Sequence, residues 1–247
     1  MEFRLLGPLS VIDRGRVRTP TAPKVRQMLS LLLLRANHTV GLDAAVEELW
    51  GDHPPHSAVL TTRTYIYLLR KAFPDWAIET VPLGYVLHVD EAVLDFKRFD
   101  RLFAEAQSCH QDGQIERAAR RVDQALAVWS GPALSNVPRG RVLDGLLTAL
   151  EDKRIAALEL HIRTQLLLGR HRELIAELRA LVAEHPFNEW FHSQLIFALH
   201  LAGRRGEALR AYRDVCGLLS DELGLAPSAD LQRAHQDVLT ATVREPA

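Results

Sequence analysis

Hydrophobic and polar positions follow one pattern in the first ninety residues and another in the rest of the chain. Short apolar runs separated by Gly7-Pro8 and Asp13-Arg14-Gly15 open the sequence and predict a small antiparallel sheet. Apolar residues then recur every three or four positions in three segments, which predicts three helices. These segments are 24–36, 43–50 and 57–73, and two strand-like runs around Pro82-Leu83-Gly84 follow as a predicted hairpin.

The first two helices have recognisable ends. Thr21 is a candidate N-cap, and Pro23 suits a first helical turn. The second helix should end at Gly51, and Val40 just before it can add one strand residue to the hairpin. The residues of the second helix expected in the core are Leu42, Val46, Leu49 and Trp50.

The third helical segment has a basic outer face. A projection at 3.6 residues per turn places one apolar stripe toward a core, made of Thr62, Ile66, Leu69 and Phe73. The opposite face holds Leu60, Thr61, Thr64, Tyr67, Leu68 and Lys71, with Arg63 and Arg70 on its flank. No acidic residue occurs between Pro54 and Pro74. Such a helix can enter the major groove of DNA, although the pattern alone also fits an ordinary helix with a solvated basic face.

Helical periodicity dominates from Asp95 to Ala241, with no strand-like run. Gly169 and Gly203 are 34 residues apart, which is the tetratricopeptide period, and Gly203 is followed five residues later by Ala208. The alternative is a plain helical bundle with coincident glycines. The predicted helices are 95–110, 115–129, 142–168, 171–184, 188–201, 205–219 and 228–241.

Charge and cysteine content limit the interpretation. The net charge is −1, and residues 1–94 carry ten basic and ten acidic side chains, so any DNA affinity must come from a local patch. Cys109 and Cys216 lie far apart without a CxxC partner, which favours reduced, buried thiols. The sequence has no apolar run long enough to span a membrane and no secretory leader. We therefore expect a cytoplasmic, nucleoid-associated protein.

Patterns for catalysis or metal binding are weak. No glycine-rich phosphate loop, GxSxG elbow or HExxH motif is present. His53 and His56 share a loop with two prolines and lack a third ligand, and the adjacent Cys109-His110 pair is no evidence for a catalytic dyad. The sequence therefore predicts no enzyme activity, no cofactor and no metal site.

A DNA-binding interpretation requires three kinds of contact. Lys24, Arg26 and the helix terminus near Ser57 would anchor phosphates. The outer face of the third helix would read bases, and the hairpin from Pro82 to Tyr85 would lie along the backbone or the minor groove. The complete set of predicted DNA-binding residues is Lys24, Arg26, Thr61, Arg63, Thr64, Tyr67, Arg70, Lys71, Thr80 and Gly84.

Several motifs resemble a known family. They are the N-terminal strands, Leu49-Trp50-Gly51, Tyr65-Ile66 before Leu69-Arg70-Lys71-Ala72, and the run from Thr80 to Leu87. Together they resemble the OmpR-type DNA-binding domain as it occurs in the Streptomyces antibiotic regulatory protein family of transcriptional activators. The helical region resembles the bacterial transcriptional activation domain of the same family. The resemblance implies an α+β winged helix-turn-helix domain at 1–92, an all-α tetratricopeptide-like domain at 95–241 and a tail at 242–247.

The resemblance also implies partners, and two departures from the family pattern bear on them. Family members bind promoter direct repeats of double-stranded DNA as a homodimer and recruit RNA polymerase, including its sigma factor, to an antibiotic biosynthetic cluster. This chain has Tyr67-Leu68 where Ser-Arg is common, and Val86 where arginine commonly follows Gly-Tyr. Losing two basic contacts implies a different target sequence, a lower affinity or a partner that supplies the rest.

Two other functions fit the same sequence. The chain could be a protein-interaction scaffold whose DNA binding has weakened. It could also be an effector-gated regulator with a ligand cavity in the helical domain, lined by Trp129, Phe187, Trp190 or Phe191.

Overall fold

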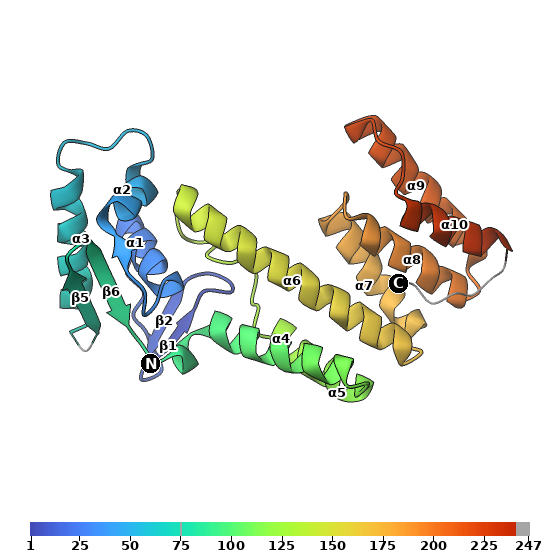
Figure 1. Cartoon of the computed structure of the whole chain (residues 1–247), viewed down its shortest axis with the longest axis horizontal. Coiled ribbons are helices and arrows are strands. Elements are labelled where there is room, and N and C mark those ends of the chain that lie inside the picture. Colours follow the sequence, from blue (N-terminus) through green and yellow to red (C-terminus); the bar gives the residue numbers. More distant parts are fainter. Residues whose placement is uncertain (75, 241–247) are drawn as a thin grey trace. The chain divides into compact units, whose positions relative to one another are not determined.

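The computed structural model describes residues 1–74 and 76–240, so the predicted tail at 242–247 and the last residue of the predicted final helix lie outside the described residues. The described chain is mostly helical, with two small antiparallel sheets in its N-terminal part (Figure 1). The N-terminal elements are β1 (Glu2–Arg4), β2 (Ser10–Asp13), β3 (Arg16–Val17), α1 (Pro23–Leu34), β4 (Val40–Gly41), α2 (Leu42–Trp50), α3 (Ala58–Ala72), β5 (Ala77–Val81) and β6 (Gly84–His88). A short 3-10 helix at Glu91–Val93 leads into the helical region.

The first sheet is antiparallel in the order β1-β2-β3, with Phe3 opposite Val11. Both side chains are buried, so this sheet contributes one face to the core. The apolar run before Gly7-Pro8 continues to Leu6, but β1 ends at Arg4. It ends there because the N–H groups of Leu5 and Leu6 donate to Asp95 instead of to a neighbouring strand.

Three helices and a hairpin follow in the predicted order. Helices α1, α2 and α3 pack against one another, and the second sheet has the order β4-β6-β5, with Val40 opposite Tyr85. The expectation that Val40 joins the hairpin is therefore confirmed. The prediction of Thr21 as N-cap is wrong, because Ala22 holds that position and no side chain caps the helix. Pro23 occupies the first turn, where its missing N–H costs nothing.

The core face of α2 differs from the prediction. Ala45, Glu48 and Leu49 are its buried residues, whereas the predicted core residues Leu42, Val46 and Trp50 are only half-buried. The prediction of Leu49 is confirmed, but hydrophobicity missed Glu48, because the hydrogen bonds that satisfy its carboxylate allow it to be buried. Trp50 instead stacks on Tyr65 of α3, with ring centroids 6.5 Å apart.

The described chain from Asp95 on is built of helices without a strand, as predicted. Each predicted helix is present, and the largest difference at an end is α9, which continues four residues beyond its predicted end. The helices are α4 (Asp95–Gln111), α5 (Ile115–Leu126), α6 (Arg141–Leu167), α7 (His171–Glu184), α8 (Glu189–Leu201), α9 (Arg205–Leu223) and α10 (Ala229–Thr240).

The repeated glycines end helices in the same way. Gly113, Gly169 and Gly203 have φ angles of 73°, 75° and 75°, a left-handed conformation that favours glycine. In each case the N–H of the next residue donates to the carbonyl five positions earlier, as Arg204 does to Leu199 at 2.9 Å. This bond satisfies a carbonyl at the helix end, so each glycine both stops a helix and turns the chain.

Contacts divide the chain into two compact units. One unit comprises Met1–Ser108 and Arg120–Ala157, and the other comprises Cys109–Ala119 with the chain from Leu158 on. The first unit therefore joins both small sheets and the three-helix group to α4 and to parts of α5 and α6. In the second unit α7, α8 and α9 pack in succession, and α10 packs on α8 and α9.

Asp95 connects α4 to the N-terminal sheet within the first unit. Its carboxylate accepts the N–H groups of Leu5 at 2.7 Å, Leu6 at 2.9 Å and Phe96 at 2.8 Å. Burial disfavours the charged carboxylate and raises the pKa of Asp95 to about 6, while the three N–H donors offset part of that rise. Asp95 is therefore a structural carboxylate at the start of a helix.

Candidate nucleic-acid interface

Helix α3 has the two faces that its sequence predicts. The predicted core stripe is confirmed, because each of its four side chains is at most 3% exposed. They are Thr62, Ile66, Leu69 and Phe73. Burying a side chain the size of Ile66 or Leu69 contributes roughly 1.5–3 kcal/mol, which fixes the rotation of the helix about its axis. The outer face is consequently held in one orientation.

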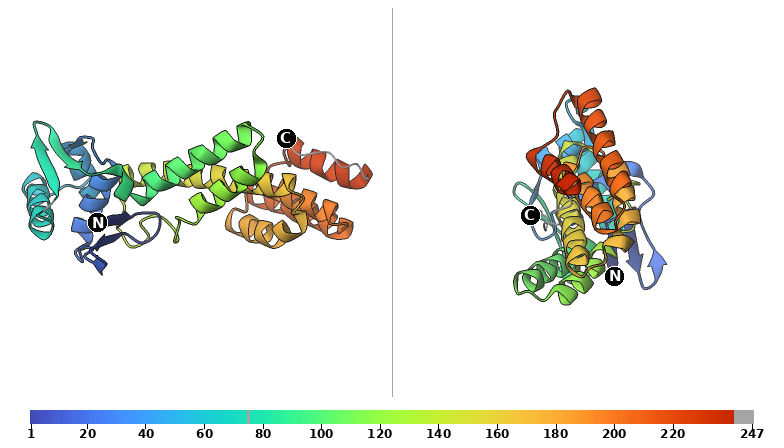
Figure 2. Two further views of the ribbon diagram at one scale, coloured as in Figure 1. Left: turned by 90° about the horizontal axis from the view of Figure 1, so that it is seen from below. Right: turned by 90° about the vertical axis from the view of Figure 1, so that its right-hand side faces the viewer.

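The predicted base-reading residues of α3 share this outer face. Thr64, Tyr67 and Lys71 are exposed, and Thr61 is half-buried. Arg63 and Arg70 are also exposed and lie on the flank that faces the hairpin. Figures 1 and 2 show α3 and the hairpin β5–β6 side by side. The predicted candidates on α3 and the hairpin therefore come together in space.

The N-terminus of α3 follows an exposed loop at residues 52–57. Ala58 N–H donates to Pro55 O, and Thr61 N–H donates to Ser57 O. Ser57 occupies the N-cap position without a side-chain bond to the helix. Val59 and Leu60 have no N–H partner among the described residues, so this terminus keeps donors that suit a phosphate.

Arg70 is committed to the hairpin. Its Nε and Nη2 donate to Ile78 O at 3.1 and 2.6 Å, and Nη2 also donates to Thr80 Oγ1 at 2.9 Å. This fork ties the exposed flank of α3 to β5 and fixes the hairpin beside the helix. Arg70 and Thr80 are both predicted site residues and lie together, but part of their hydrogen-bonding capacity is used between them.

The hairpin has a two-residue tip at Pro82-Leu83, where Leu83 is 80% exposed. Gly84 is buried at the start of β6, and a Cβ there would lie 2.0 Å from Val40 O. Glycine is therefore required for β4 to approach β6. Leu83 O accepts the N–H of Leu42, which fixes the tip against the start of α2.

Lys24 and Arg26 lie on α1, and both are half-buried. Lys24 Nζ donates to Leu49 O at the end of α2 and to Gln27 Oε1 at 3.2 Å. Arg26 Nε is a buried nitrogen without a hydrogen-bond partner among the described residues. The structure does not bring either side chain into the group formed by α3 and the hairpin, and it gives Lys24 a role in ending α2.

The two departures from the family pattern occupy different environments. Val86 is 7% exposed within β6, so an apolar side chain suits its position. Leu68 is 40% exposed on α3. Only the second departure therefore changes the chemistry of the exposed outer face.

A groove of about 510 Å³ separates α3 from the hairpin. Arg63, Arg70 and Thr80 line it, together with Asp43 from the first turn of α2. Two guanidinium groups and one hydroxyl suit a phosphate oxygen better than an apolar ligand. The sequence did not predict Asp43 at this groove, because its position depends on how α2 packs against α3.

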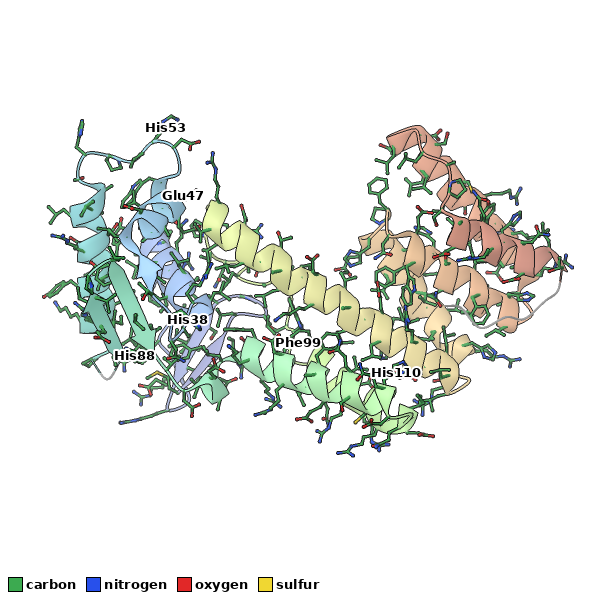
Figure 3. The ribbon with its side chains drawn as sticks, viewed as in Figure 1. His38, Glu47, His53, His88, Phe99 and His110 are labelled. Carbon is green, nitrogen blue, oxygen red and sulfur yellow. The ribbon has the colours of Figure 1, made fainter. Side chains whose placement is uncertain are left out.

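The histidines and cysteines that were singled out in the sequence, and the aromatic residues expected around a ligand cavity, do not line this groove. His53 lies on the exposed loop between α2 and α3 (Figure 3), and the described residues contain no group of three potential metal ligands. Both cysteines are free, but Cys216 is half-buried rather than buried. Of the aromatics expected around a ligand cavity, Trp129 packs edge-on against Phe99 at 5.6 Å, and Trp190 packs on Phe191 at the same distance.

Comparison with known proteins assigns the helical region first. Residues 94–239 match the bacterial transcriptional activator domain. The chain is 38% identical to Regulatory protein DnrI of Streptomyces peucetius, over 98% of this chain and 93% of that protein. It is 34% identical to Transcriptional regulator RedD of Streptomyces coelicolor, over 97% of this chain and 70% of that protein.

A solved structure has the same fold. It is Mycobacterium tuberculosis EmbR in complex with a low affinity phosphopeptide, with a TM-score of 0.90 and 31% identity over 99% of this chain. This chain spans 66% of the EmbR chain. None of the helices in the described part of our chain combines the length and apolar character needed to cross a bilayer. The match to the activator domain and the identity to these regulators show that the chain belongs to the Streptomyces antibiotic regulatory protein family of transcriptional regulators.

Proposed function

We propose that this protein is a sequence-specific DNA-binding activator whose N-terminal part is a winged helix-turn-helix domain. The observation that carries the proposal is the outer face of α3. It presents Arg63 and Lys71 to solvent beside a fixed hairpin, on a segment with no acidic residue from 53 to 74. A local basic face of this kind supplies phosphate attraction even though the net charge of the chain is −1.

In this proposal α3 enters the major groove, and the hairpin follows the DNA backbone or the minor groove. The free N–H groups at the start of α3 and the arginine-lined groove beside the hairpin would hold phosphates on either side. Lys24 and Arg26 would contact the DNA backbone only if their side chains left the half-buried positions described above. The weight of the proposal therefore falls on α3 and the hairpin.

The second part of the proposal concerns activation. Residues 95–241 would act as a tetratricopeptide-like domain, supported by the recurring glycine turns and the successive packing of α7, α8 and α9. Two copies would bind promoter direct repeats and contact RNA polymerase with its sigma factor, so that binding energies on DNA and polymerase add. Membership of the Streptomyces antibiotic regulatory protein family supports a target in an antibiotic biosynthetic cluster, and a cytoplasmic location follows from that role.

A groove in the second unit favours a second candidate function. It has a volume of about 520 Å³ on helices α7–α9 and is lined by Val182, Leu195 and Val215, with Arg179 and Asp214 among its charged residues. An apolar floor with charges at its edge suits a peptide. The chain could therefore be an interaction scaffold, or a regulator gated by an effector in this groove.

Gel-shift titration tests the main proposal. Promoter fragments from the gene neighbourhood of the protein would be titrated with wild type, Arg63→Ala and Lys71→Ala at two salt concentrations. Wild type should shift a discrete fragment, and each variant should bind more weakly. A variant that loses a phosphate contact should also lower the salt slope by about one.

The matched control is Arg101→Ala, which removes an exposed arginine of α4 in the same compact unit. It should bind like wild type. If Arg63→Ala, Lys71→Ala and Arg101→Ala bind DNA with the same affinity, the electrostatic attraction to DNA is diffuse and α3 is not the helix that reads the bases. If wild type shifts no fragment at low salt, the DNA-binding proposal fails and the scaffold function takes its place.

A further inference from the structure

We infer that the outer face of α3 recognises thymine methyl groups, so that the target DNA carries thymines at the positions that face Leu60 and Leu68. The inference rests on the proposed DNA binding and adds the chemistry of the base contacts. It comes from the surface of α3 in this chain and concerns which base pairs the helix can accept.

The outer face of α3 is unusually apolar for a surface helix. Leu60 is 66% exposed, Tyr67 is 62% exposed and Leu68 is 40% exposed. Positions 60, 64, 67, 68 and 71 recur at helical spacing, so these side chains form one stripe opposite the buried stripe of Ile66 and Leu69. Large apolar side chains grouped on an exposed face indicate a surface that is covered when the protein acts.

The polar groups on this stripe have few free donors. Thr64 Oγ1 donates to Leu60 O at 3.0 Å, so its hydroxyl hydrogen is used within the helix. Arg70 donates to the hairpin. Apart from Lys71 at its C-terminal end, the stripe is therefore dominated by carbon, with Tyr67 supplying the one hydroxyl group that is not used within the helix. Thymine is the one base that presents a methyl group in the major groove, and apolar side chains contact that methyl.

The surroundings of the stripe favour DNA over a protein groove. Arg63 lies on its flank and Lys71 is its last member, no acidic residue lies between 53 and 74, and unpartnered N–H groups mark the start of the helix. This combination complements phosphates on both sides of an apolar contact. Leu60 and Leu68 are about 12 Å apart along the helix axis, so they can address base pairs up to about three steps apart.

Replacing thymine by deoxyuridine tests the inference, because uracil lacks only the methyl group. The DNA fragment that the full chain protects would be synthesised with thymine and with deoxyuridine throughout the footprint. Fluorescence anisotropy at one salt concentration would compare wild type, Leu60→Ala, Leu68→Ala and the control Leu223→Ala. Leu223 is 47% exposed on α9, which matches the exposure of Leu68.

Wild type should bind the deoxyuridine fragment more weakly, by about fourfold for each methyl group in contact. Leu60→Ala and Leu68→Ala should each reduce this preference for thymine, whereas Leu223→Ala should keep it. Equal affinity of wild type for both fragments would overturn the inference and leave DNA binding standing. Failure to bind any fragment would overturn the inference together with the proposed function. Loss of a protein partner in both leucine variants, with DNA affinity unchanged, would assign the stripe to protein recognition instead.

Discussion

Glu48 holds the start of α6 against the three-helix group of the first unit. Its side chain is 2% exposed, and Oε1 accepts the N–H of Gly140 at 2.7 Å while Oε2 accepts the N–H of Leu143 at 2.8 Å. Gln27 Nε2 donates to Oε1 at 2.8 Å. The carboxylate of one helix therefore caps another helix that begins at Arg141. Negative charge at a helix N-terminus also interacts favourably with the helix dipole.

Glu48→Gln tests how much this cap contributes. The amide keeps one oxygen, but its NH₂ group must face one of the N–H donors of Gly140 or Leu143. That substitution removes a charge-assisted hydrogen bond and leaves a buried donor unpaired, which should lower the free energy of unfolding by about 2–4 kcal/mol. The structure has little room to relax, because a Cβ added at Gly140 would lie 2.2 Å from Glu48 O.

The neighbouring residue provides the control. Glu47 is exposed on the same helix (Figure 3), so Glu47→Gln should change stability by less than about 0.5 kcal/mol. Urea unfolding would measure both variants. Hydrogen exchange at the amides of Gly140 and Leu143 would report the cap itself, with exchange about 30-fold faster for each 2 kcal/mol lost from local stability. Equal stability of the two variants, or unchanged protection of these amides, would refute the capping role.

Three further substitutions test the first unit. Burial raises the pKa of Asp95 to about 6, above its unfolded value of about 3.9. Its contribution to the free energy of unfolding is therefore complete below about pH 4, and about 3 kcal/mol of that free energy is lost as the pH rises through 6. Urea midpoints from pH 4 to 8 should therefore fall more steeply for wild type than for Asp95→Asn, and parallel curves would contradict this. Gly84→Ala places a Cβ 2.0 Å from Val40 O and should cost about 1–3 kcal/mol. Gly145→Ala, inside α6 with nothing within 4 Å of the added Cβ, should instead stabilise the fold by about 0.5–1 kcal/mol. Similar shifts in the melting temperatures of the two glycine variants would contradict the crowding at Gly84.

Periodicity predicted the elements because each depends mainly on nearby residues. The buried stripe of α3 follows from its apolar spacing, and the hairpin follows from the strand runs on either side of Pro82-Leu83. The left-handed turns at Gly169 and Gly203 were also visible as a 34-residue spacing. In these cases the residue that determines the local structure lies within that structure.

The orientation of individual site residues depended on contacts between elements. Arg70 was predicted as a DNA contact, and its guanidinium donates hydrogen bonds to Ile78 and Thr80 on the following strand, a contact that helical periodicity cannot predict. Val86 was predicted as a lost basic contact, yet it is buried in β6. Both outcomes follow from how the hairpin lies against the helices, and helix or strand patterns carry no information about that placement.

Hydrogen bonds between residues far apart in the sequence connect the N-terminal elements to the helical region that follows them. Leu5 and Leu6 bond to Asp95, Leu9 bonds to Asn136 at 2.7 Å, and Glu48 bonds to Gly140 and Leu143. The family resemblance implies a domain boundary at residue 92, and that boundary remains a prediction. The first compact unit nevertheless extends to Ala157, because buried polar groups on one side of residue 92 are satisfied by backbone groups on the other. Since α2 packs against α3, substitutions at the start of α6 should act on the proposed recognition face of α3 through Glu48, and gel-shift titration should then show a change in the proposed DNA binding.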